Sequence, residues 1–260
     1  MLFEVITVEP MTWEDKVYLI SGGTSGIGLA TARLLLERGA SVVINGRSAQ
    51  RGEAALAALG GPAWPCSFIS GDVSNPKDCA NLVDQTLAIF GHLDGVVTSA
   101  GYYAEELLEN VTPESLEDMF RVNVYGTIYL CQAALTALKR THGSMVLVSS
   151  DAGLQGNIAC SVYGATKGAV VSFGRSLALE LAPHNVRVNT VCPGDVKTPL
   201  LAKQMAADPE LTEDGLRAQY PMYRLAEADE VARVIAFLLS TDASYMTGTA
   251  IPVDGGLTSW

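Results

Sequence analysis

The stretch Ser21-Gly22-Gly23-Thr24-Ser25-Gly26-Ile27-Gly28 joins an apolar run to a helical pattern. Glycines at such a junction allow a tight turn, and they let the backbone approach a pyrophosphate that binds to the free amides of the helix N-terminus. The spacing is GxxxGxG rather than the commoner GxGxxG, so a purely structural turn is the alternative interpretation. The strand–turn–helix context favours a dinucleotide site, with candidate residues Gly22, Thr24, Ser25, Gly26, Ile27 and Gly28.

Outward from this turn, short apolar runs alternate with helical stretches. The predicted strands are Val17–Ile20, Ser41–Asn45, Cys66–Ser70, Gly95–Ser99, Ser144–Ser149, Arg187–Val191 and Ala250–Val253. The predicted helices are Gly26–Arg38, Pro76–Phe90, Pro113–Leu138, Val162–Leu181 and Asp229–Leu239. Continuously apolar strands between helices are typical of a parallel sheet that is covered on both faces. The sequence therefore predicts a single doubly wound α/β domain with a seven-stranded parallel sheet.

The composition narrows the class of protein and of partner. The chain has 260 residues, and 17 Lys+Arg against 28 Asp+Glu give a formal net charge of −11. The charged share of 17% lies below the roughly 25% of average domains, which excludes a charge-rich disordered chain. An acidic balance argues against nucleic acid or an anionic membrane as partner. No apolar run reaches the length of about 18 residues that predicts a membrane-spanning helix.

The cysteines and the chain ends suggest a compartment and a domain division. The five cysteines form no CxxC pair, and with only three histidines no metal site is predicted. Their odd number and apolar surroundings fit reduced thiols. The segment Met1–Pro10 contains no Lys or Arg, unlike a signal peptide, so the predicted location is cytoplasmic. Residues 1–12 are expected to be an N-terminal extension, and residues 13–260 the catalytic domain.

The end of the second predicted strand bears on the choice of cofactor. Sites for NAD usually place Asp or Glu there, whereas an Arg accommodates the 2′-phosphate of NADP. The run Val43-Ile44-Asn45-Gly46-Arg47-Ser48 has no carboxylate. Arg47 offers a bidentate fork for phosphate and Ser48 a hydroxyl, which favours NADP(H) over NAD(H). The alternative is that Arg47 is a solvated charge at the start of a helix.

A tyrosine and a lysine share one face of a later helix. In Tyr163-Gly164-Ala165-Thr166-Lys167 the i, i+4 spacing places the two side chains one turn apart. An ammonium beside a phenol draws its pKa down from about 10, which makes tyrosine a plausible acid or base. Upstream, Ser149-Ser150 ends the fifth predicted strand, where catalytic groups of doubly wound sheets gather.

With these residues in place, the chain resembles the short-chain dehydrogenase/reductase family in its common form, and especially members similar to 3-oxoacyl-carrier-protein reductase. The resemblance extends from Lys16 to Gly256 and implies a Rossmann fold. The matching elements, in chain order, are the glycine loop with Ser21 in place of Thr, Asp72-Val73, Thr98-Ser99-Ala100-Gly101, Asn123, Ser150, the YxxxK of Tyr163 and Lys167, Pro193-Gly194-Asp195-Val196-Lys197-Thr198, and Asp254-Gly255-Gly256. Ser99 departs from the asparagine that is usual there, whereas all four positions of the family's catalytic tetrad are kept.

The resemblance implies roles for the tetrad. Tyr163 would be the general acid or base, and Ser150 would orient the substrate oxygen. Lys167 would hold the nicotinamide ribose and lower the pKa of the tyrosine. Asn123 would keep a water in a proton path through a local break in its helix; taken alone, it would be a helix-interior polar group bonded to backbone.

The resemblance also implies a set of binding residues. Asp72 and Val73 would contact adenine, although Asp72 alone could merely cap a turn. Further cofactor contacts would come from Ala100, Gly101, Tyr163, Lys167, Pro193, Gly194, Val196 and Thr198. Substrate contacts would come from Ser150, Gln155, Asn157 and Tyr163. No metal is required, because the hydroxyls of Ser150 and Tyr163 would meet the charge on the carbonyl oxygen.

The long connection at residues 195–224 is the expected substrate loop, with helical pieces at Leu200–Ala207 and Leu211–Ala218. The predicted activity is hydride transfer between nicotinamide and a secondary alcohol or ketone, the substrate being neutral or weakly polar. The alternative is a catalytically silent NADP(H)-binding regulatory or scaffold subunit. The small charged share, the glycine-containing helices and the tail Ala250–Trp260 favour a homo-oligomer, as the family commonly forms, and a homotetramer over a dimer.

Overall fold

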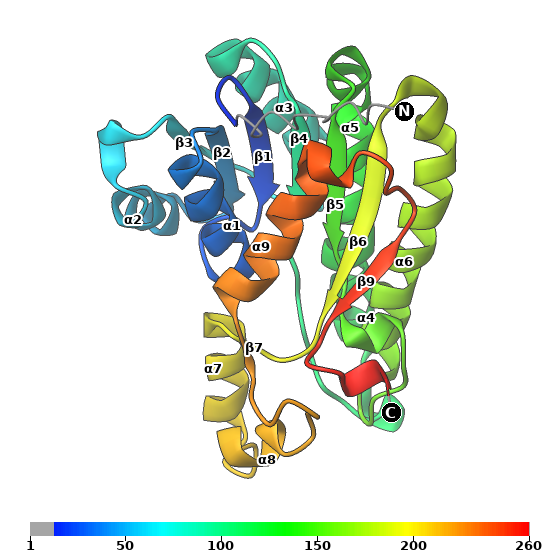
Figure 1. Cartoon of the computed structure of the whole chain (residues 1–260). Coiled ribbons are helices and arrows are strands. Elements are labelled where there is room, and N and C mark those ends of the chain that lie inside the picture. Colours follow the sequence, from blue (N-terminus) through cyan, green and yellow to red (C-terminus); the bar gives the residue numbers. More distant parts are fainter. Residues whose placement is uncertain (1–12, 260) are drawn as a thin grey trace, which may run out of the picture.

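The computed structural model describes residues 13–259, so the predicted extension at residues 1–12 lies outside the described part. Seven parallel strands form one sheet, in the order β3-β2-β1-β4-β5-β6-β9 (Figure 1). Their bounds are β1 (Val17–Ser21), β2 (Ser41–Gly46), β3 (Cys66–Ser70), β4 (Gly95–Thr98), β5 (Ser144–Val148), β6 (Arg187–Pro193) and β9 (Ala250–Val253). The chain order reverses between β1 and β4, the position at which doubly wound sheets bind ligands. The predicted fold class is confirmed.

Helices cover both faces of this sheet. One face carries α1 (Gly26–Glu37), α2 (Ala49–Ala58) and α9 (Ala228–Leu239). The other carries α3 (Pro76–Phe90), α5 (Gly126–Thr141) and α6 (Ser161–Leu181). Consecutive residues of a strand point to opposite faces of the sheet. Leu19 packs in the core on the α3, α5 and α6 face, and Ile20 packs in the core on the α1, α2 and α9 face. This double burial explains why the strands are continuously apolar.

The predicted helix Pro113–Leu138 is not continuous. It is divided into α4 (Pro113–Phe120), a π-helical turn at Arg121–Tyr125, and α5, which extends to Thr141. The wider turn contains Asn123, whose carbonyl accepts a hydrogen bond of 2.8 Å from Thr127 Oγ1. π-Turns inside helices are frequent at functional sites, and here the turn redirects the chain at the expected position of the break.

The expected substrate loop is a small unit closed at its base. The short strands β7 (Val196–Lys197) and β8 (Ala226–Glu227) pair in parallel and bring the two ends of the loop together. Between them lie α7 (Pro199–Ala207) and α8 (Glu213–Arg217), close to the predicted helical pieces and at the carboxyl ends of the main strands (Figure 1). The loop has its own hydrophobic cluster, formed by Leu201, Leu216, Tyr220 and Leu225.

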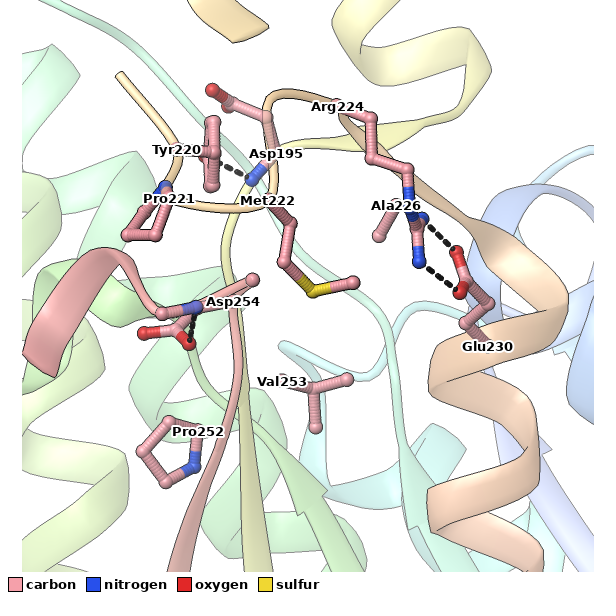
Figure 2. Close-up of a pocket in the computed structure, with 12 residues that line it drawn as sticks. Asp195, Tyr220, Pro221, Met222, Arg224, Ala226, Glu230, Pro252, Val253 and Asp254 are labelled. Carbon is pink, nitrogen blue, oxygen red and sulfur yellow. Dashed lines mark hydrogen bonds and ion pairs between the residues drawn. The ribbon is translucent and has the colours of Figure 1, made fainter. Parts of the chain in front are cut away.

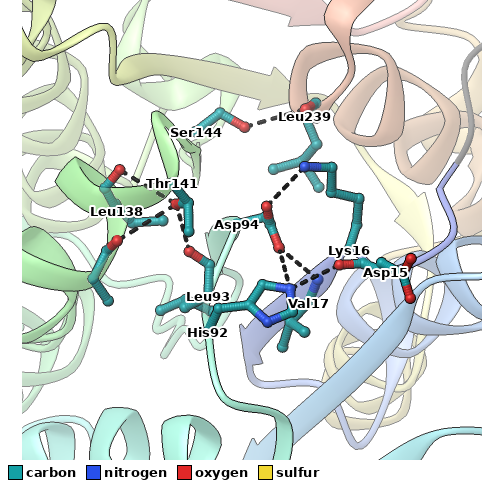
Figure 3. Close-up of polar contacts among 11 residues, drawn as sticks. Asp15, Lys16, Val17, His92, Leu93, Asp94, Leu138, Thr141, Ser144 and Leu239 are labelled. Carbon is teal, nitrogen blue, oxygen red and sulfur yellow. Dashed lines mark hydrogen bonds and ion pairs between the residues drawn. The ribbon is translucent and has the colours of Figure 1, made fainter.

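A buried carboxylate organises the amino end of the sheet (Figure 3). Asp94, just before β4, accepts hydrogen bonds of 2.9 Å from the Val17 backbone N–H and from Lys16 Nζ. His92 Nε2 lies 3.2 Å from the same carboxylate and 2.7 Å from the carbonyl of Asp15. The backbone of Asp94 also accepts from the Ser144 N–H at 2.9 Å. One residue thus ties together the starts of β1, β4 and β5.

Within residues 13–259, no helix combines the length and the apolar character needed to cross a membrane.

Candidate active site

The glycine turn after β1 is packed so tightly that side chains would not fit. A Cβ at Gly28 would lie 2.5 Å from the carbonyl oxygen of Gly22, and one at Gly22 would lie 2.7 Å from the backbone nitrogen of Ala100. Gly22 also has a positive φ of 65°, which glycine adopts without strain. The turn therefore brings bare backbone to the switch point between β1 and β4.

The N-terminus of α1 faces this turn without a side-chain cap. Ser25 occupies the cap position, yet its side chain accepts no hydrogen bond from the first turn of the helix. The free amides and the positive end of the helix dipole together form a site that suits a phosphate. A Cβ at Gly26 would lie 3.2 Å from the methyl group of Thr198, so the substrate loop begins beside this turn.

The end of β2 is arranged as an open basic site. Arg47 is exposed, and Ser48 caps α2 by accepting a hydrogen bond of 3.4 Å from the Arg51 N–H. Asp72 accepts from the Ser74 N–H at 2.9 Å, so it does cap the following turn. Burial acts to raise the pKa of Asp72, but the hydrogen bonds from Ser74 and the charge of Arg47 outweigh it and lower the pKa. Asp72 and Arg47 therefore lie close enough at one edge of the turn to interact electrostatically.

The carboxyl end of β4 closes the other side of the turn. The Ala100 N–H donates to Ser21 Oγ at 3.3 Å, and the Ser99 N–H donates to the Ser21 carbonyl at 3.2 Å. Ser99, which replaces the usual asparagine, thus holds β1 to β4 through its backbone. Thr98 Oγ1 is buried and has no hydrogen-bond partner within residues 13–259.

Asn123 is buried and bonded on both sides of its amide. Its Nδ2 donates to the carbonyl of Tyr102 at 2.8 Å and to Thr166 Oγ1 at 3.1 Å. Its Oδ1 accepts from the Tyr102 N–H at 2.7 Å. Asn123 therefore joins the segment after β4 to α6, one residue before Lys167. These contacts are those of a polar group bonded mainly to backbone, and the proton relay remains a prediction.

Lys167 is a buried ammonium with little compensation. Its Nζ donates to the carbonyl of Val148 at 3.2 Å and lies 5.6 Å from the centre of the Tyr163 ring. Burial lowers the pKa of Lys167 to about 8. An ammonium with one protein acceptor has further hydrogens available for a ligand.

Tyr163 lies between Lys167 and the carboxyl end of β5. Burial raises the pKa of Tyr163 above its usual value, the neighbouring Ser150 hydroxyl opposes this, and Asp151, Cys160 and Asp195 raise it further. The direction is opposite to the one expected from Lys167 alone, because desolvation and nearby carboxylates outweigh an ammonium that is itself desolvated. The ring of Tyr103 meets that of Tyr163 edge-on, with centroids 4.7 Å apart.

The serine of the tetrad begins a short polar chain. Ser150 Oγ donates to Asp151 Oδ1 at 2.7 Å, and Asn157 Nδ2 donates to Asp151 Oδ2 at 2.9 Å. Gln155 Nε2 reaches Asn157 Oδ1 at 3.4 Å. The predicted substrate residues Gln155 and Asn157 are thus connected to Ser150 through Asp151, a residue that the sequence analysis did not single out.

The end of β6 brings the remaining predicted residues to the same place. Pro193 ends β6, and a Cβ at Gly194 would meet the ring of Tyr220 at 2.8 Å. Val196 is buried in β7, and Thr198 caps α7 by accepting from the Leu201 N–H at 3.5 Å. Val73 packs under the π-turn, where it leaves no room for a Cβ at Gly126. The structure therefore gathers the predicted residues along one edge of the sheet.

Comparisons with known proteins agree with this geometry. A family model described as Enoyl-(Acyl carrier protein) reductase matches residues 22–258. A solved structure of a short-chain dehydrogenase/reductase, glucose/ribitol dehydrogenase from Brucella melitensis, is 36% identical, with a TM-score of 0.88 over 95% of this chain and 98% of that one. The chain belongs to the short-chain dehydrogenase/reductase family.

Two further proteins are similar to this short-chain dehydrogenase/reductase over nearly its whole length. The 3-oxoacyl-[acyl-carrier-protein] reductase of Bos taurus is 36% identical over 94% of this chain and 98% of that protein. A solved structure described as ElxO with NADP bound is 30% identical, with a TM-score of 0.89 over 94% of this chain and 99% of that one. The expected resemblance to oxoacyl reductases is confirmed.

The residues of this family member fit a nicotinamide dinucleotide. The uncapped helix N-terminus and the glycine turn, which any Cβ would fill, suit the pyrophosphate. Arg47 is exposed at the end of β2, and Lys167 has hydrogens left for a ribose. The glycine turn, Arg47 and Lys167 are thus residues that could hold such a group, and the other predicted cofactor contacts stay predictions.

A hollow of about 650 Å³ borders this site between the substrate loop and β9 (Figure 2). Its wall includes Asp195, whose backbone N–H donates to Tyr220 Oη at 2.6 Å, and the bidentate pair of Arg224 with Glu230 at 2.7 and 2.8 Å. Burial raises the pKa of Asp195, and Asp151 and Glu105 raise it further. The wall of the hollow thus contains a carboxyl group, that of Asp195, which lies close enough to Tyr163 to raise its pKa.

The cysteines of this dehydrogenase/reductase carry no visible chemistry. All five are free. Burial raises the pKa of Cys66 and of Cys192 to about 11, so these thiols are poor nucleophiles at neutral pH. Among the described side chains, no three His, Cys, Asp or Glu groups gather as a metal site.

Proposed function

We propose that the protein is an NADP(H)-dependent oxidoreductase that interconverts a secondary alcohol and a ketone, with Tyr163 as the general acid and base. One observation carries the proposal: the first turns of α6 place Tyr163 beside a buried, under-bonded Lys167 and beside Ser150 at the carboxyl end of β5. A phenol and a hydroxyl that converge at the carboxyl end of a parallel strand suit proton transfer to one substrate oxygen.

The mechanism assigns a task to each side chain. When bound, the dinucleotide supplies or accepts the hydride. Tyr163 Oη gives a proton to the substrate oxygen during reduction and takes it back during oxidation. The raised pKa of Tyr163 keeps the phenol protonated at neutral pH, which is the state that a general acid needs. Lys167 holds the ribose and stabilises negative charge on the phenol, and Asn123 fixes the segment after β4 against α6.

Replacing Tyr163 tests the activity directly. Tyr163→Phe should lower turnover by about a thousandfold, because it removes the acid–base group and little else. The measurement is nicotinamide absorbance with a panel of secondary alcohols and ketones, alongside cofactor binding by fluorescence. Tyr245→Phe, at an exposed tyrosine, is the matched control and should leave turnover unchanged. Equal rates for Tyr163→Phe and wild type would contradict the proposal. Tight cofactor binding without any turnover would favour the regulatory or scaffold role.

The preference for NADP(H) rests on the end of β2. Arg47 is exposed and lies close enough to Asp72 to lower the pKa of that carboxyl. The run Val43–Ser48, which contains Arg47, has no carboxylate. Arg47→Ala should weaken NADPH binding by roughly tenfold to a hundredfold, because a charge-assisted hydrogen bond to phosphate is lost, and should leave NADH binding nearly unchanged. Arg33→Ala, at an exposed arginine of α1, is the control. Unchanged NADPH affinity in Arg47→Ala would remove this residue from the site.

The substrate proposed is a neutral or weakly polar secondary alcohol or ketone. The two named relatives act, by their descriptions, on different compounds, a sugar or polyol and a 3-oxoacyl group, so the substrate is argued from this chain. Asp151, Asp195 and Glu105 lie near Tyr163 and Cys160, and their charges disfavour an anionic substrate. A comparison of neutral and carboxylate-bearing ketones of equal size measures this selection; equal KM values for the two would contradict it.

A homotetramer is proposed for the assembly. Leu179 on α6 and Phe237 on α9 are large apolar side chains left exposed in the single chain, and β9 is an edge strand. Faces of this kind suit contact with further copies of the chain. Light scattering of the purified protein should give four times the chain mass, and the mass of a single chain would contradict the proposal.

A further inference from the structure

The carboxylate of Asp195 lies next to the tetrad. Asp195 follows shortly after Pro193, the last residue of β6, and β6 pairs in parallel with β5, whose carboxyl end leads to Ser150. The Asp195 side chain is half-buried, and its charge is close enough to Tyr163 to raise the pKa of that phenol. The carboxylate therefore borders the space in which a substrate oxygen would meet Tyr163 and Ser150.

The two other carboxylates near the tetrad already bind donors of the chain. Asp151 accepts a hydrogen bond of 2.9 Å from Asn157 Nδ2. Glu105 accepts one of 2.8 Å from Tyr103 Oη. Both donors are neutral groups, an amide and a phenol. A ligand that approached either carboxylate would have to compete with these donors.

No cation of the surrounding loop compensates Asp195. Lys197, two residues further along the chain, lies 3.2 Å from Glu213 and 3.3 Å from Glu227. The guanidinium of Arg224 binds a carboxylate of α9 in a bidentate pair. No ion pair among residues 13–259 includes Asp195. A half-buried carboxylate without a cation keeps acceptor positions for a ligand.

A buried tyrosine from the far end of the substrate loop fixes Asp195 in place (Figure 2). The Asp195 N–H donates to Tyr220 Oη at 2.6 Å. The phenol keeps its own hydrogen, and the Tyr220 hydroxyl lowers the pKa of Asp195, as a donor beside a carboxylate does. The ring lies against Gly194 and Gly255, where an added Cβ would approach it to 2.8 and 3.5 Å. Tyr220 thus holds the backbone of Asp195 and lies beside its carboxylate.

We propose that Asp195 determines substrate specificity: its carboxylate accepts a hydrogen bond from a second hydroxyl group of the substrate, so that the preferred substrates are diols, polyols and their hydroxyketones. Tyr220 is the positioning residue that holds Asp195 for this contact. This assignment rests on the proposed function, because it names the substrate class of the same site. A neutral hydroxyl is favoured over an ammonium, because the neighbouring carboxylates are also bonded by neutral donors.

A methyl ether tests for the hydrogen that Asp195 is expected to accept. Oxidation rates with NADP⁺ at neutral pH are compared for cyclohexanol, the cis and trans cyclohexanediols, and the monomethyl ethers of these diols. The best diol should exceed cyclohexanol in kcat/KM by about tenfold to a hundredfold. Its ether should lose this advantage, because an ether keeps the oxygen but has no hydrogen to donate to a carboxylate.

Three outcomes of this comparison would overturn the proposal. In the first, no diol exceeds cyclohexanol. In the second, the ether keeps the advantage of its diol, so that the second hydroxyl does not act as a donor. In the third, the amino analogue of the best diol exceeds every diol, which would assign the carboxylate to an ammonium group instead.

Variants separate contact from positioning. Asp195→Ala should bring the best diol to within about threefold of cyclohexanol, whereas Asp195→Asn keeps an oxygen acceptor and should retain part of the preference. Tyr220→Phe should lower kcat/KM for the diol by about threefold to tenfold and leave cyclohexanol within about twofold, whereas a merely structural role would lower both alike. Asp84→Asn, at an exposed carboxylate of α3, is the control. An unchanged ratio of diol to cyclohexanol in Asp195→Ala would overturn the proposal.

Binding in a complex that cannot react separates this proposal from the proposed function. The diols and cyclohexanol are titrated into the enzyme with NADPH, and binding is followed by nuclear magnetic resonance. At least one diol should bind about tenfold more tightly than cyclohexanol, and Asp195→Ala should remove the difference. That result in a protein that oxidises no alcohol would count against the proposed function alone. Oxidation of cyclohexanol and of every diol with equal kcat/KM and equal affinity would overturn the role of Asp195 alone.

Discussion

The two ends of β4 carry buried polar groups in opposite states. At its amino end, Asp94 receives two hydrogen bonds of 2.9 Å and lies 3.2 Å from His92 Nε2. At its carboxyl end, Thr98 Oγ1 has no partner within the described residues, and the nearby Lys167 ammonium has the carbonyl of Val148 at 3.2 Å. One end satisfies its charge within the chain, whereas the other leaves donors open.

The difference separates groups that stabilise the fold from groups that serve a ligand. A buried charge without full compensation destabilises the native state, so its presence needs another explanation than stability. Asp94 has that compensation and joins three strands. Lys167 lacks it, and its pKa is lowered accordingly. The uncompensated charge at the carboxyl end of the sheet therefore destabilises the native state, whereas the compensated charge at the amino end stabilises it.

The largest expected effect comes from removing the buried ammonium. Lys167→Met should lower turnover by about a thousandfold, because the variant loses both the contact to the ribose and the charge beside Tyr163. Steady-state rates with the best substrate of the panel measure it. Lys77→Met, at an exposed lysine of α3, is the control for a lost positive charge. Turnover of Lys167→Met within tenfold of wild type would contradict the claim that this buried ammonium is present for activity.

The same residue gives a pH-dependent stability. Burial lowers the pKa of Lys167 from 10.5 to about 8. Below about pH 8 both states carry the proton and the native state bears the full penalty; between the two values the unfolded state binds more protons, so stability rises with pH. Lys167→Met should thus exceed wild type by about 3 kcal/mol below pH 8, and this advantage should vanish as the pH approaches the ordinary pKa.

Urea denaturation of both proteins on either side of about pH 8 measures this difference. If the difference in free energy of unfolding stays constant with pH, or widens as the pH rises, burial does not destabilise the charged form of Lys167.

At the amino end, the effect should fall on stability alone. Asp94→Ala leaves the buried Val17 N–H and Lys16 without their acceptor and should destabilise the fold by about 2 kcal/mol, with kcat little changed. Asp94→Asn keeps an acceptor for the Val17 N–H and should recover part of that loss. Urea denaturation combined with initial rates distinguishes the two readouts. A large loss of kcat in a fully stable Asp94→Ala would contradict the division of labour between the two ends.

The smallest expected effect concerns Thr98. Thr98→Val replaces a buried hydroxyl that has no partner by a methyl group of the same shape, which should raise stability by about 1 kcal/mol. The control is Thr86→Val, whose buried hydroxyl donates to the carbonyl of Leu82 at 2.7 Å and whose loss should destabilise by about as much. Calorimetry of the two variants without cofactor checks the opposite signs. A destabilised Thr98→Val would mean that this hydroxyl already contributes to the fold.

Local sequence patterns predict the sheet and most residues of the candidate site. The glycine turn at Gly22–Gly28 and the Tyr163–Lys167 pair could be predicted because each lies within a few consecutive residues, on one turn and on one helix face. The strands were predictable because parallel strands buried on both faces are continuously apolar. The bounds of the helix α2 were not predicted, and the π-turn at Arg121–Tyr125 has no pattern that fixes its ends.

Other features depend on contacts between distant residues. Asp94 meets Val17 across 77 positions of the chain, so nothing near it in the sequence marks it as a buried acceptor. Asp151 stands beside Ser150 in the sequence, yet its contacts with both Ser150 and Asn157 are visible only in the structure. The pKa of Tyr163 was expected to fall because Lys167 is its neighbour, whereas burial and three acidic groups, seen only in three dimensions, raise it.

The pairing of β7 with β8 has a consequence for how such a protein can change. Val196 and Ala226 are held side by side, so the two ends of the intervening segment lie at almost one point. Leu201, Leu216, Tyr220 and Leu225 form a hydrophobic cluster within this segment, and Leu257 packs against it from outside. Exchanging this segment for that of a relative would preserve the two anchored ends, provided that the new segment keeps the contact of Tyr220 with Gly194. The segment is therefore closed at its base and could be exchanged between related chains as one unit.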